Sequence, residues 1–421
     1  MTFRFVHAAD LHLDTPFKGL TVSDEHVAQA LRDASLDTFD NLVQLAIDRG
    51  VAFVLLAGDI YDGESRGVRA QLRFLRGLQR LSAGNIQVFI VHGNHDPLGG
   101  WSAIRQWPQG VMAFGHEGVE CHPVESNGLR LANVYGISYP RQDVTENLSL
   151  RFRRQNGPGL HIGLLHCNVG NNPEHGSYSP CELDDLVRAG MDYWALGHIH
   201  KRPSTYPREP WVVYPGNLQG RSPKPSECGP KGAVVVEADP AGIRSVEFVE
   251  LDKARFVQTR VDVASAGDFA GLRQLLVESG ERLREEHGQR DLVVRAVLEG
   301  SGDVHSELIE ARIEELLLDL RREYEHRRPI LYWERIVDRS SPEVNLSAIR
   351  DRGDFLGEVL RHSESLGADP QQMQAFFAEH IADLHRLPAR LREDLDLPDD
   401  QDVLSRARMV ALEMLQREVQ E

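Results

Sequence analysis

Seven side chains of the kinds that bind divalent metal ions occur in five short clusters along this sequence. They are Asp10, His12, Asp59, Asn94, His166, His198 and His200. Their donor atoms are oxygen and nitrogen without thiolate, which favours Mn or Fe over a closed structural zinc site but leaves zinc open. The carboxylate of Asp59 has two oxygens that can bridge neighbouring ions. We therefore predict a site for two metal ions.

The spacing within two of the clusters suits coordination. In Asp10-x-His12 and His198-x-His200 the two ligands stand two residues apart, and in an extended segment this spacing points both side chains to one side. The first pair can therefore bind one ion together. The second pair could give one imidazole to each ion.

Residues 93–96 combine a ligand with groups that could act on a substrate. Asn94 offers an amide oxygen that brings no negative charge, and His95 is free to meet the substrate. Asp96 can hold the tautomer of that imidazole, so we predict His95 and Asp96 as catalytic residues. Each such pattern arises by chance in many chains when it is taken alone. Their order along the chain and their position after strands give them weight.

Each cluster follows an apolar run that is typical of a β-strand, rich in β-branched and aromatic residues. The runs are residues 3–7, 52–56, 86–91, 160–165 and 192–196. In open α/β sheets, sites form at the carboxyl ends of strands because loops converge there while the buried strands hold them rigid. We therefore expect the ligands to gather at strand ends, with Gly58 permitting a sharp turn from the second run to Asp59.

The chain changes its pattern twice. Strand and helix patterns alternate up to about residue 250, which predicts an α/β layered domain at residues 1–255. The next elements, expected at residues 256–263, 268–286, 292–298, 305–325 and 330–337, have the order β-α-β-α-β and suit a small domain at residues 256–340. From residue 346 only helical periodicity remains, so residues 341–421 are predicted to be a helical C-terminal region. Its apolar faces could pack on one another or on a partner.

Composition limits the classes of protein that this chain could be. With 421 residues and 41% hydrophobic content, it can bury a sizeable core in two or three domains. No apolar run approaches the roughly 20 residues that span a bilayer, and charged residues interrupt the first stretch. We therefore expect a cytoplasmic protein without a membrane partner. The four cysteines lack paired spacing and are interpreted as reduced thiols.

The formal net charge of −17 argues against a chain that coats nucleic acid non-specifically. However, residues 343–421 carry 9 basic and 17 acidic side chains, a net of −8, so nearly half of the excess lies far from the ligand clusters. Basic residues do surround the last clusters: Arg151, Arg153, Arg154, Lys201, Arg202, Arg221, Lys224 and Lys231. Two bound cations would add positive charge where a phosphodiester must sit. Net charge therefore does not exclude DNA.

The ordered clusters resemble the calcineurin-like metallophosphoesterase superfamily. Within it, residues 8–14, 166–169 and 214–221 resemble the YhaO-type branch of DNA repair exonucleases, relatives of the SbcD nuclease subunit. Protein Ser/Thr phosphatases of the superfamily usually continue the second motif with Asp-Arg-Gly, whereas here Gly63-Glu64 follows Asp62. The resemblance implies a four-layer α/β/β/α sandwich with a small α/β capping domain and a helical C-terminal region.

The resemblance also implies roles for the site residues. One ion would be bound by Asp10, His12 and His200, the other by Asn94, His166 and His198, and both by Asp59. His95 would stay off the metals and stabilise or protonate the departing oxygen. Some relatives carry a catalytic histidine at the position of Asp62, which we interpret here as a structural turn residue.

The function implied by the resemblance is that of a Mn-dependent DNA exonuclease, in which a water activated by two metals hydrolyses the phosphodiester. It further implies an SbcC-like or YhaN-like coiled-coil ATPase partner docked on the C-terminal helices, and a homodimer formed through the phosphoesterase domain. One alternative is a phosphodiesterase or phosphatase acting on nucleotides or other small phosphoesters. A non-enzymatic scaffold is disfavoured because all seven ligand positions and His95 are filled.

Overall fold

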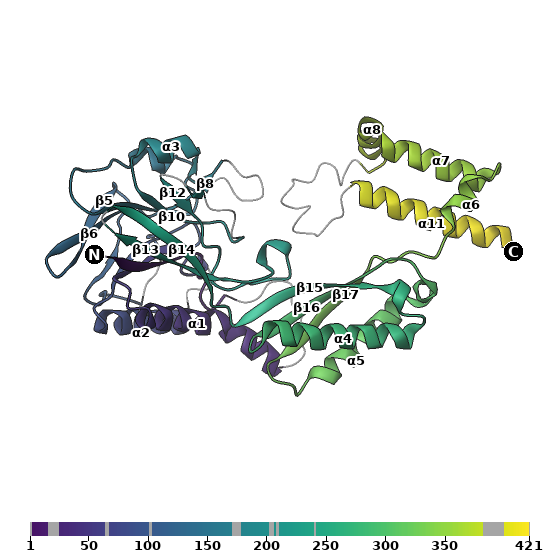
Figure 1. Cartoon of the computed structure of the whole chain (residues 1–421), viewed down its shortest axis with the longest axis horizontal. Coiled ribbons are helices and arrows are strands. Elements are labelled where there is room, and N and C mark those ends of the chain that lie inside the picture. Colours follow the sequence, from purple (N-terminus) through teal and green to yellow (C-terminus); the bar gives the residue numbers. More distant parts are fainter. Residues whose placement is uncertain are drawn as a thin grey trace. The chain divides into compact units, whose positions relative to one another are not determined.

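The computed structural model describes residues 2–15, 25–63, 67–100, 103–170, 178–201, 206–207, 210–239, 241–381 and 400–420. The chain divides into two compact units, Met1–Phe256 and Val257–Glu421. Figure 1 shows the elements of both, and each unit is described by itself.

The first unit contains two six-stranded sheets. One sheet has the order β14 (Gly242–Glu250), β13 (Gly232–Asp239), β1 (Phe3–Ala8), β2 (Phe53–Ala57), β3 (Gln87–Val91), β4 (Val111–Ala113). The other has the order β11 (Tyr206–Pro207), β12 (Trp211–Val213), β10 (Tyr193–Gly197), β7 (Leu160–His166), β6 (Leu129–Gly136), β5 (Glu120–Ser126). β1 to β4 run parallel, as do β6, β7, β10 and β12, so the carboxyl ends of β1, β2 and β3 meet at one edge of their sheet. A short pair, β8 (Asn168–Val169) and β9 (Pro180–Cys181), follows β7.

The two sheets pack face to face because side chains alternate along each strand. Phe5 and Phe53 stack with ring centroids 4.7 Å apart, and Phe5 meets Tyr193 of the other sheet edge-on at 5.3 Å. The neighbouring side chains of β1 and β2, Val6 and Val54, point to the opposite face and pack under helices.

Helices cover the outer faces of both sheets. α1 (Glu25–Asp48) and α2 (Val68–Ala83) pack Phe39 and Phe74 against the first sheet. α3 (Leu183–Arg188) packs Leu186 against Trp194 of the second sheet. The resulting layers are α/β/β/α, so the predicted fold class is confirmed.

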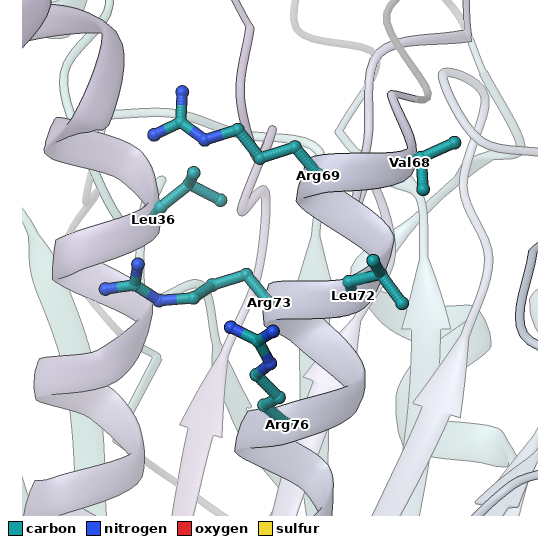
Figure 2. Close-up of a pocket in the computed structure, with 6 residues that line it drawn as sticks. All are labelled: Leu36, Val68, Arg69, Leu72, Arg73 and Arg76. Carbon is teal, nitrogen blue, oxygen red and sulfur yellow. The ribbon is translucent and has the colours of Figure 1, made fainter.

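A groove of about 400 Å³ lies between α1 and α2. It is lined by Leu36, Val68, Arg69, Leu72, Arg73 and Arg76 (Figure 2). Val68 and Leu72 are exposed apolar side chains, whereas Arg69 and Arg73 form ion pairs with carboxylates of α1.

The second unit begins with a three-stranded sheet and two helices. The elements are β15 (Ala254–Asp262), which starts in the first unit, α4 (Phe269–His287), β16 (Asp291–Glu299), α5 (Glu310–Tyr324) and β17 (Leu331–Asp338). This is the predicted β-α-β-α-β order, and its core surrounds Trp333. The helix expected from residue 305 begins only at Glu310, because residues 303–307 form a 3-10 turn.

Helices α6 (Leu346–Arg350), α7 (Phe355–Ala368), α8 (Pro370–His380) and α11 (Asp400–Gln420) follow. They bury two small apolar clusters, one around Leu360 and Leu412 and one around Phe377 and Leu404. The helices therefore pack on one another around a thin core. Among the described residues, no helix is long and apolar enough to cross a bilayer.

Candidate metal centre

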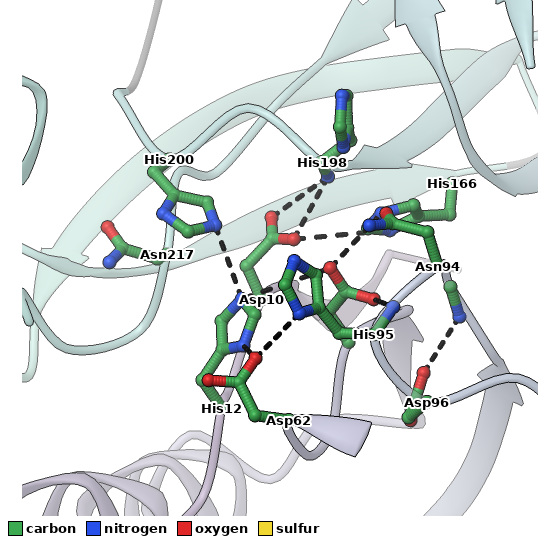
Figure 3. A network of polar contacts seen from close by, with 12 residues as sticks. Asp10, His12, Asp62, Asn94, His95, Asp96, His166, His198, His200 and Asn217 are labelled. Carbon is green, nitrogen blue, oxygen red and sulfur yellow. Dashed lines mark hydrogen bonds and ion pairs between the residues drawn. The ribbon is translucent and has the colours of Figure 1, made fainter. Parts of the chain in front are cut away.

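The predicted ligands come together at the carboxyl ends of five strands from both sheets. Asp10 follows β1, Asp59 follows β2 and Asn94 follows β3, while His166 ends β7. His198 and His200 follow β10. Figure 3 shows the contacts among these side chains. The structure therefore places the predicted ligands at strand ends, as we expected.

The first group of donor atoms consists of Asp10, His12 and His200. One donor atom from each of the three residues lies within 4.8 Å of the other two. The Nε2 atoms of His12 and His200 face one another at 3.2 Å (Figure 3). In both rings the other nitrogen, Nδ1, contacts a carboxylate, which requires a proton on Nδ1. Both Nε2 lone pairs are thus left for a cation.

The second group consists of Asp10, Asp59 and His166, whose donor atoms also lie within 4.8 Å of one another. His166 Nε2 is 3.0 Å from Asn94 Oδ1 and 3.4 Å from Asp59 Oδ2. His166 Nδ1 donates to the backbone oxygen of Ala57 at 2.9 Å, so a cation that displaces the proton of Nε2 would find its lone pair beside Asn94 and Asp59.

These distances fit divalent ions. Neighbouring ligands that each lie about 2.1 Å from one ion are roughly 3 Å apart in octahedral geometry. The distances between His12 Nε2 and His200 Nε2, 3.2 Å, and between His166 Nε2 and Asn94 Oδ1, 3.0 Å, are close to this value. Asp59 Oδ2 also lies 3.8 Å from His12 Nε2, so this carboxylate stands between the two groups. Asp10 belongs to both groups. The donor set, made of carboxylate, amide and imidazole, therefore fits divalent metal ions.

The charges of the centre also favour a bound cation. Burial raises the pKa of Asp10 to about 6, although nearby His166 opposes the shift. Burial lowers the pKa of His166, but the charge of Asp59 and its hydrogen bond outweigh burial and raise that pKa to about 9. Burial lowers the pKa of His12 to about 3, which leaves its Nε2 bare. A positive charge is therefore favoured at His166, beside Asp59 and Asp10, whereas burial keeps the His12 ring neutral.

His198 differs from the other predicted ligands. Its backbone N–H donates to both carboxylate oxygens of Asp10 at 3.0 Å, while its ring points away from Asp10 (Figure 3). The ring lies 5.2 Å from the ring of His166, between centroids. In the described part of the chain, the groups of three or more metal-binding side chains do not include His198.

The ligand loops have a strained backbone. Four predicted ligands have positive φ angles, namely Asp10 (51°), His12 (42°), Asp59 (50°) and His198 (102°). Non-glycine residues rarely adopt this region, and such residues cluster at functional sites. Gly58, with a φ of +89°, makes the sharp turn predicted for it, and a Cβ there would lie 2.4 Å from His166 Nδ1.

The prediction that Asp96 orients the His95 ring is wrong. The carboxylate of Asp96 turns back into its own loop, where it accepts from the backbone N–H of Gly93 at 2.8 Å and of Ile60 at 3.0 Å. It also contacts His92 Nδ1 at 3.2 Å. With these bonds Asp96 stabilises the loop that carries Asn94 and does not hold the His95 ring.

Asp62 holds the His95 ring instead. Its Oδ1 accepts from His95 Nδ1 at 2.7 Å and from His12 Nδ1 at 3.0 Å, and Arg221 donates to its Oδ2 at 3.0 Å. Asp62, which we interpreted as a structural turn residue, therefore also orients the rings of His95 and His12. Burial opposes protonation of His95, but the hydrogen bond that its ring donates to Asp62 and the charges of Asp59 and Asp62 together outweigh burial and raise the pKa of His95 above its ordinary value.

Sequence reasoning missed Glu227, which is buried and whose Oε1 accepts from His200 Nδ1 at 2.7 Å. It lies in a stretch rich in Pro and Gly without a motif of its own. Of the basic residues noted in the sequence, Arg221 and Lys231 reach the site. Arg151 and Arg154 form ion pairs with surface carboxylates, and Arg202 lies outside the described residues.

Comparison with known proteins agrees with this geometry. Residues 3–202 match the calcineurin-like phosphoesterase family, and residues 256–341 match the middle domain of metallophosphoesterase YhaO. The chain belongs to the calcineurin-like metallophosphoesterases, as the resemblance predicted, and is a hydrolase of phosphoesters.

Three proteins of known sequence show which members of the family this chain is similar to. The chain is 35% identical over 347 residues to the uncharacterized metallophosphoesterase YhaO of Bacillus subtilis, which covers 82% of this chain and 83% of that protein. It is 25% identical over 340 residues to the DNA double-strand break repair protein Mre11 of Sulfolobus acidocaldarius, covering 79% and 74%. It is 26% identical over 276 residues to the SbcD component of the nuclease SbcCD of Bacillus subtilis, covering 56% and 66%.

Proposed function

We propose that this protein is a DNA exonuclease that depends on two divalent metal ions, Mn in the first place, with Fe and Zn as alternatives. The observation that carries the proposal is the pair of donor groups that share Asp10, with Asp59 of the second group 3.8 Å from His12 of the first. His95 lies beside them, in a further group with His12 and Asp62. Similarity to a DNA break repair protein and to a nuclease component supports DNA as the substrate. A role in DNA repair and a cytoplasmic location belong to the same proposal.

The ligand assignment is part of this proposal. One ion would be bound by Asp10, His12 and His200, the other by Asn94, His166 and His198, and both by Asp59. For His198 this assignment requires its ring to turn toward the centre. The domain bounds 1–255, 256–340 and 341–421, with the second domain capping the site, are likewise proposed.

Two such ions would supply an activated water and would neutralise charge on the phosphoryl oxygens. The chain supplies the rest. The raised pKa of His95 favours the ring with a proton on both nitrogens. Its Nδ1–H then donates to Asp62, and its Nε2–H can give a proton to the departing sugar oxygen. The His95 side chain is 36% exposed, whereas that of His12 is fully buried, so a strand end could reach His95.

Activity on two substrates tests the proposal. With Mn present, we expect linear duplex DNA labelled at its ends to be shortened, and EDTA to abolish the reaction. The alternative, a phosphodiesterase or phosphatase of nucleotides and other small phosphoesters, predicts hydrolysis of a chromogenic bis-ester and of nucleotides while the duplex stays intact. Intact duplex at every enzyme concentration that cleaves the bis-ester would rule out the exonuclease.

We propose the C-terminal helices as the docking site of an SbcC-like or YhaN-like coiled-coil ATPase. Phe355 of α7 and Val410 and Met414 of α11 are exposed although the two helices pack together, which leaves apolar surface for a coiled coil. We expect a chain that ends at residue 341 to keep bis-ester hydrolysis and to lose the ATPase in a pull-down. Equal capture by the truncated and the full chain would contradict this docking site.

A homodimer is proposed through the groove between α1 and α2. Its exposed Val68 and Leu72 suit a second copy of the same surface (Figure 2). Sedimentation equilibrium of the wild type and Leu72→Glu measures this directly. A wild type that stays monomeric at high concentration would contradict the proposed dimer.

A further inference from the structure

The segment from Asn217 to Lys231 holds His200 at three points. The backbone N–H of Asn217 donates to the backbone oxygen of His200 at 3.1 Å, and Lys231 Nζ donates to the same oxygen at 2.9 Å. Glu227 Oε1 accepts from the other end of the residue, ring atom Nδ1, at 2.7 Å. Both the backbone and the ring of His200 are therefore held by a segment that contributes none of the predicted ligands.

Glu227 is itself fixed in place. Its Oε2 accepts from Asn217 Nδ2 at 2.7 Å and from the backbone N–H of Arg221 at 3.1 Å, which leaves Oε1 for His200. The residue is only 7% exposed. A buried carboxylate is costly unless it is hydrogen-bonded and paired with positive charge, and the buried ammonium of Lys231 lies nearby.

The ionised carboxylate of Glu227 can only accept hydrogen bonds, so it fixes the tautomer of its partner. The proton of His200 must lie on Nδ1, and the lone pair of Nε2 then points toward His12 Nε2, 3.2 Å away. In metal sites the second nitrogen of a ligating histidine is usually bonded in this way, which orients the ring and strengthens the ligand.

We propose that Glu227 is a positioning residue that sets the tautomer and the ring orientation of His200 for one metal ion. The inference deepens the proposed function, because it rests on His200 being a ligand. Glu227 touches neither substrate nor ion in this role. Its substitution should therefore weaken one of the two metal sites and leave the other unchanged.

Metal titration of the full chain tests this inference. We expect calorimetry to give two Mn ions for the wild type, and 10-fold to 100-fold weaker binding of one ion for Glu227→Gln. The Gln side chain would present an NH₂ group, which cannot accept a hydrogen bond, to one of the three donors that bond to the carboxylate of Glu227. With Co²⁺ as the probe, the d–d absorption bands of the variant should shift, which a loss of stability alone would not cause.

Glu334→Gln is the matched control. Glu334 is 8% exposed and pairs with Arg295 in the second unit, so its loss perturbs a buried ion pair without touching the centre. We expect this variant to bind Mn and Co²⁺ as the wild type does. If Glu227→Gln does not fold, Glu227→Asp takes its place, since the shorter carboxylate should also weaken one site by at least about fivefold.

The outcomes separate this inference from the proposed function. If His200→Ala still binds two Mn ions with wild-type affinity, the proposed ligand set fails and the inference falls with it. If His200→Ala loses one ion while the folded Glu227 variant keeps wild-type affinity and the wild-type Co²⁺ spectrum, the metal centre stands and the inference is overturned.

Discussion

Replacing Asp59 with asparagine should lower Mn-dependent hydrolysis of a bis-ester by at least about 10³-fold, because a loss of roughly 4 kcal/mol of transition-state stabilisation corresponds to this factor. Asp59 is the carboxylate that stands 3.4 Å from His166 Nε2 and 3.8 Å from His12 Nε2, and in the proposed ligand set it would bind both ions. An amide has one oxygen in place of two and carries no charge. We therefore expect the variant to bind at most one Mn ion, as measured by calorimetry and metal analysis.

Thermal denaturation adds a readout that is independent of turnover. A ligand present at 100 times its dissociation constant adds about 2.7 kcal/mol to the free energy of unfolding. The melting temperature of the wild type should therefore rise with Mn, and that of Asp59→Asn should rise much less. Asp239→Asn, a surface change in the same unit that removes the ion pair with Arg244, should behave as the wild type. Two Mn ions bound to Asp59→Asn with unchanged affinity would remove the shared carboxylate from the proposal.

The ligands could be found from the sequence because each lies within a few residues of a strand that carries it. Asp10, Asp59 and Asn94 follow β1, β2 and β3, and parallel pairing of these strands places the three loops side by side. The layers could be predicted for the same reason, since alternating side chains such as Phe5 and Val6 must cover two faces.

The orienting groups could not be found, because they come from distant segments. Asp96 lies next to His95 in the sequence, yet its carboxylate accepts from the backbone of its own loop. Asp62, which follows a different strand, reaches His95 instead. Glu227 lies 27 positions from His200, beyond a stretch whose Pro and Gly residues indicate only turns.

The acidic charge of the chain does not weigh against DNA at this site. Arg221 pairs with Asp62, Lys231 donates to the backbone of His200, and two ions would neutralise Asp10 and Asp59. The local charge therefore differs from the net charge of −17. Lys231 is largely buried, where desolvation lowers its pKa, and its amine already donates to His200 and Ser226. Positive charge for the substrate must therefore come from the ions and from exposed basic side chains.

Replacing His95 with asparagine should leave both Mn ions bound and lower the turnover of DNA by about 10²-fold to 10⁴-fold, the usual contribution of a general acid. The two substrates separate this role from others. A nitrophenolate leaves without a proton, whereas the sugar oxygen of DNA needs one. The loss should therefore be much larger for DNA than for bis(p-nitrophenyl) phosphate, measured as kcat with calorimetric Mn binding alongside.

Asp62→Asn and Asp96→Asn are the comparison variants for His95. Asp62 holds the His95 ring at Nδ1, so its loss should again be larger for DNA than for the bis-ester, although smaller than for His95→Asn. Asp62 also contacts His12, so Mn affinity must be measured for this variant. Asp96→Asn should affect both substrates equally, because Asp96 supports the loop and not the ring. Equal losses of DNA and bis-ester turnover for His95→Asn would contradict proton donation by His95. Loss of a Mn ion from this variant would instead make His95 a metal ligand, because only a ring that stays off the metals can protonate the departing oxygen.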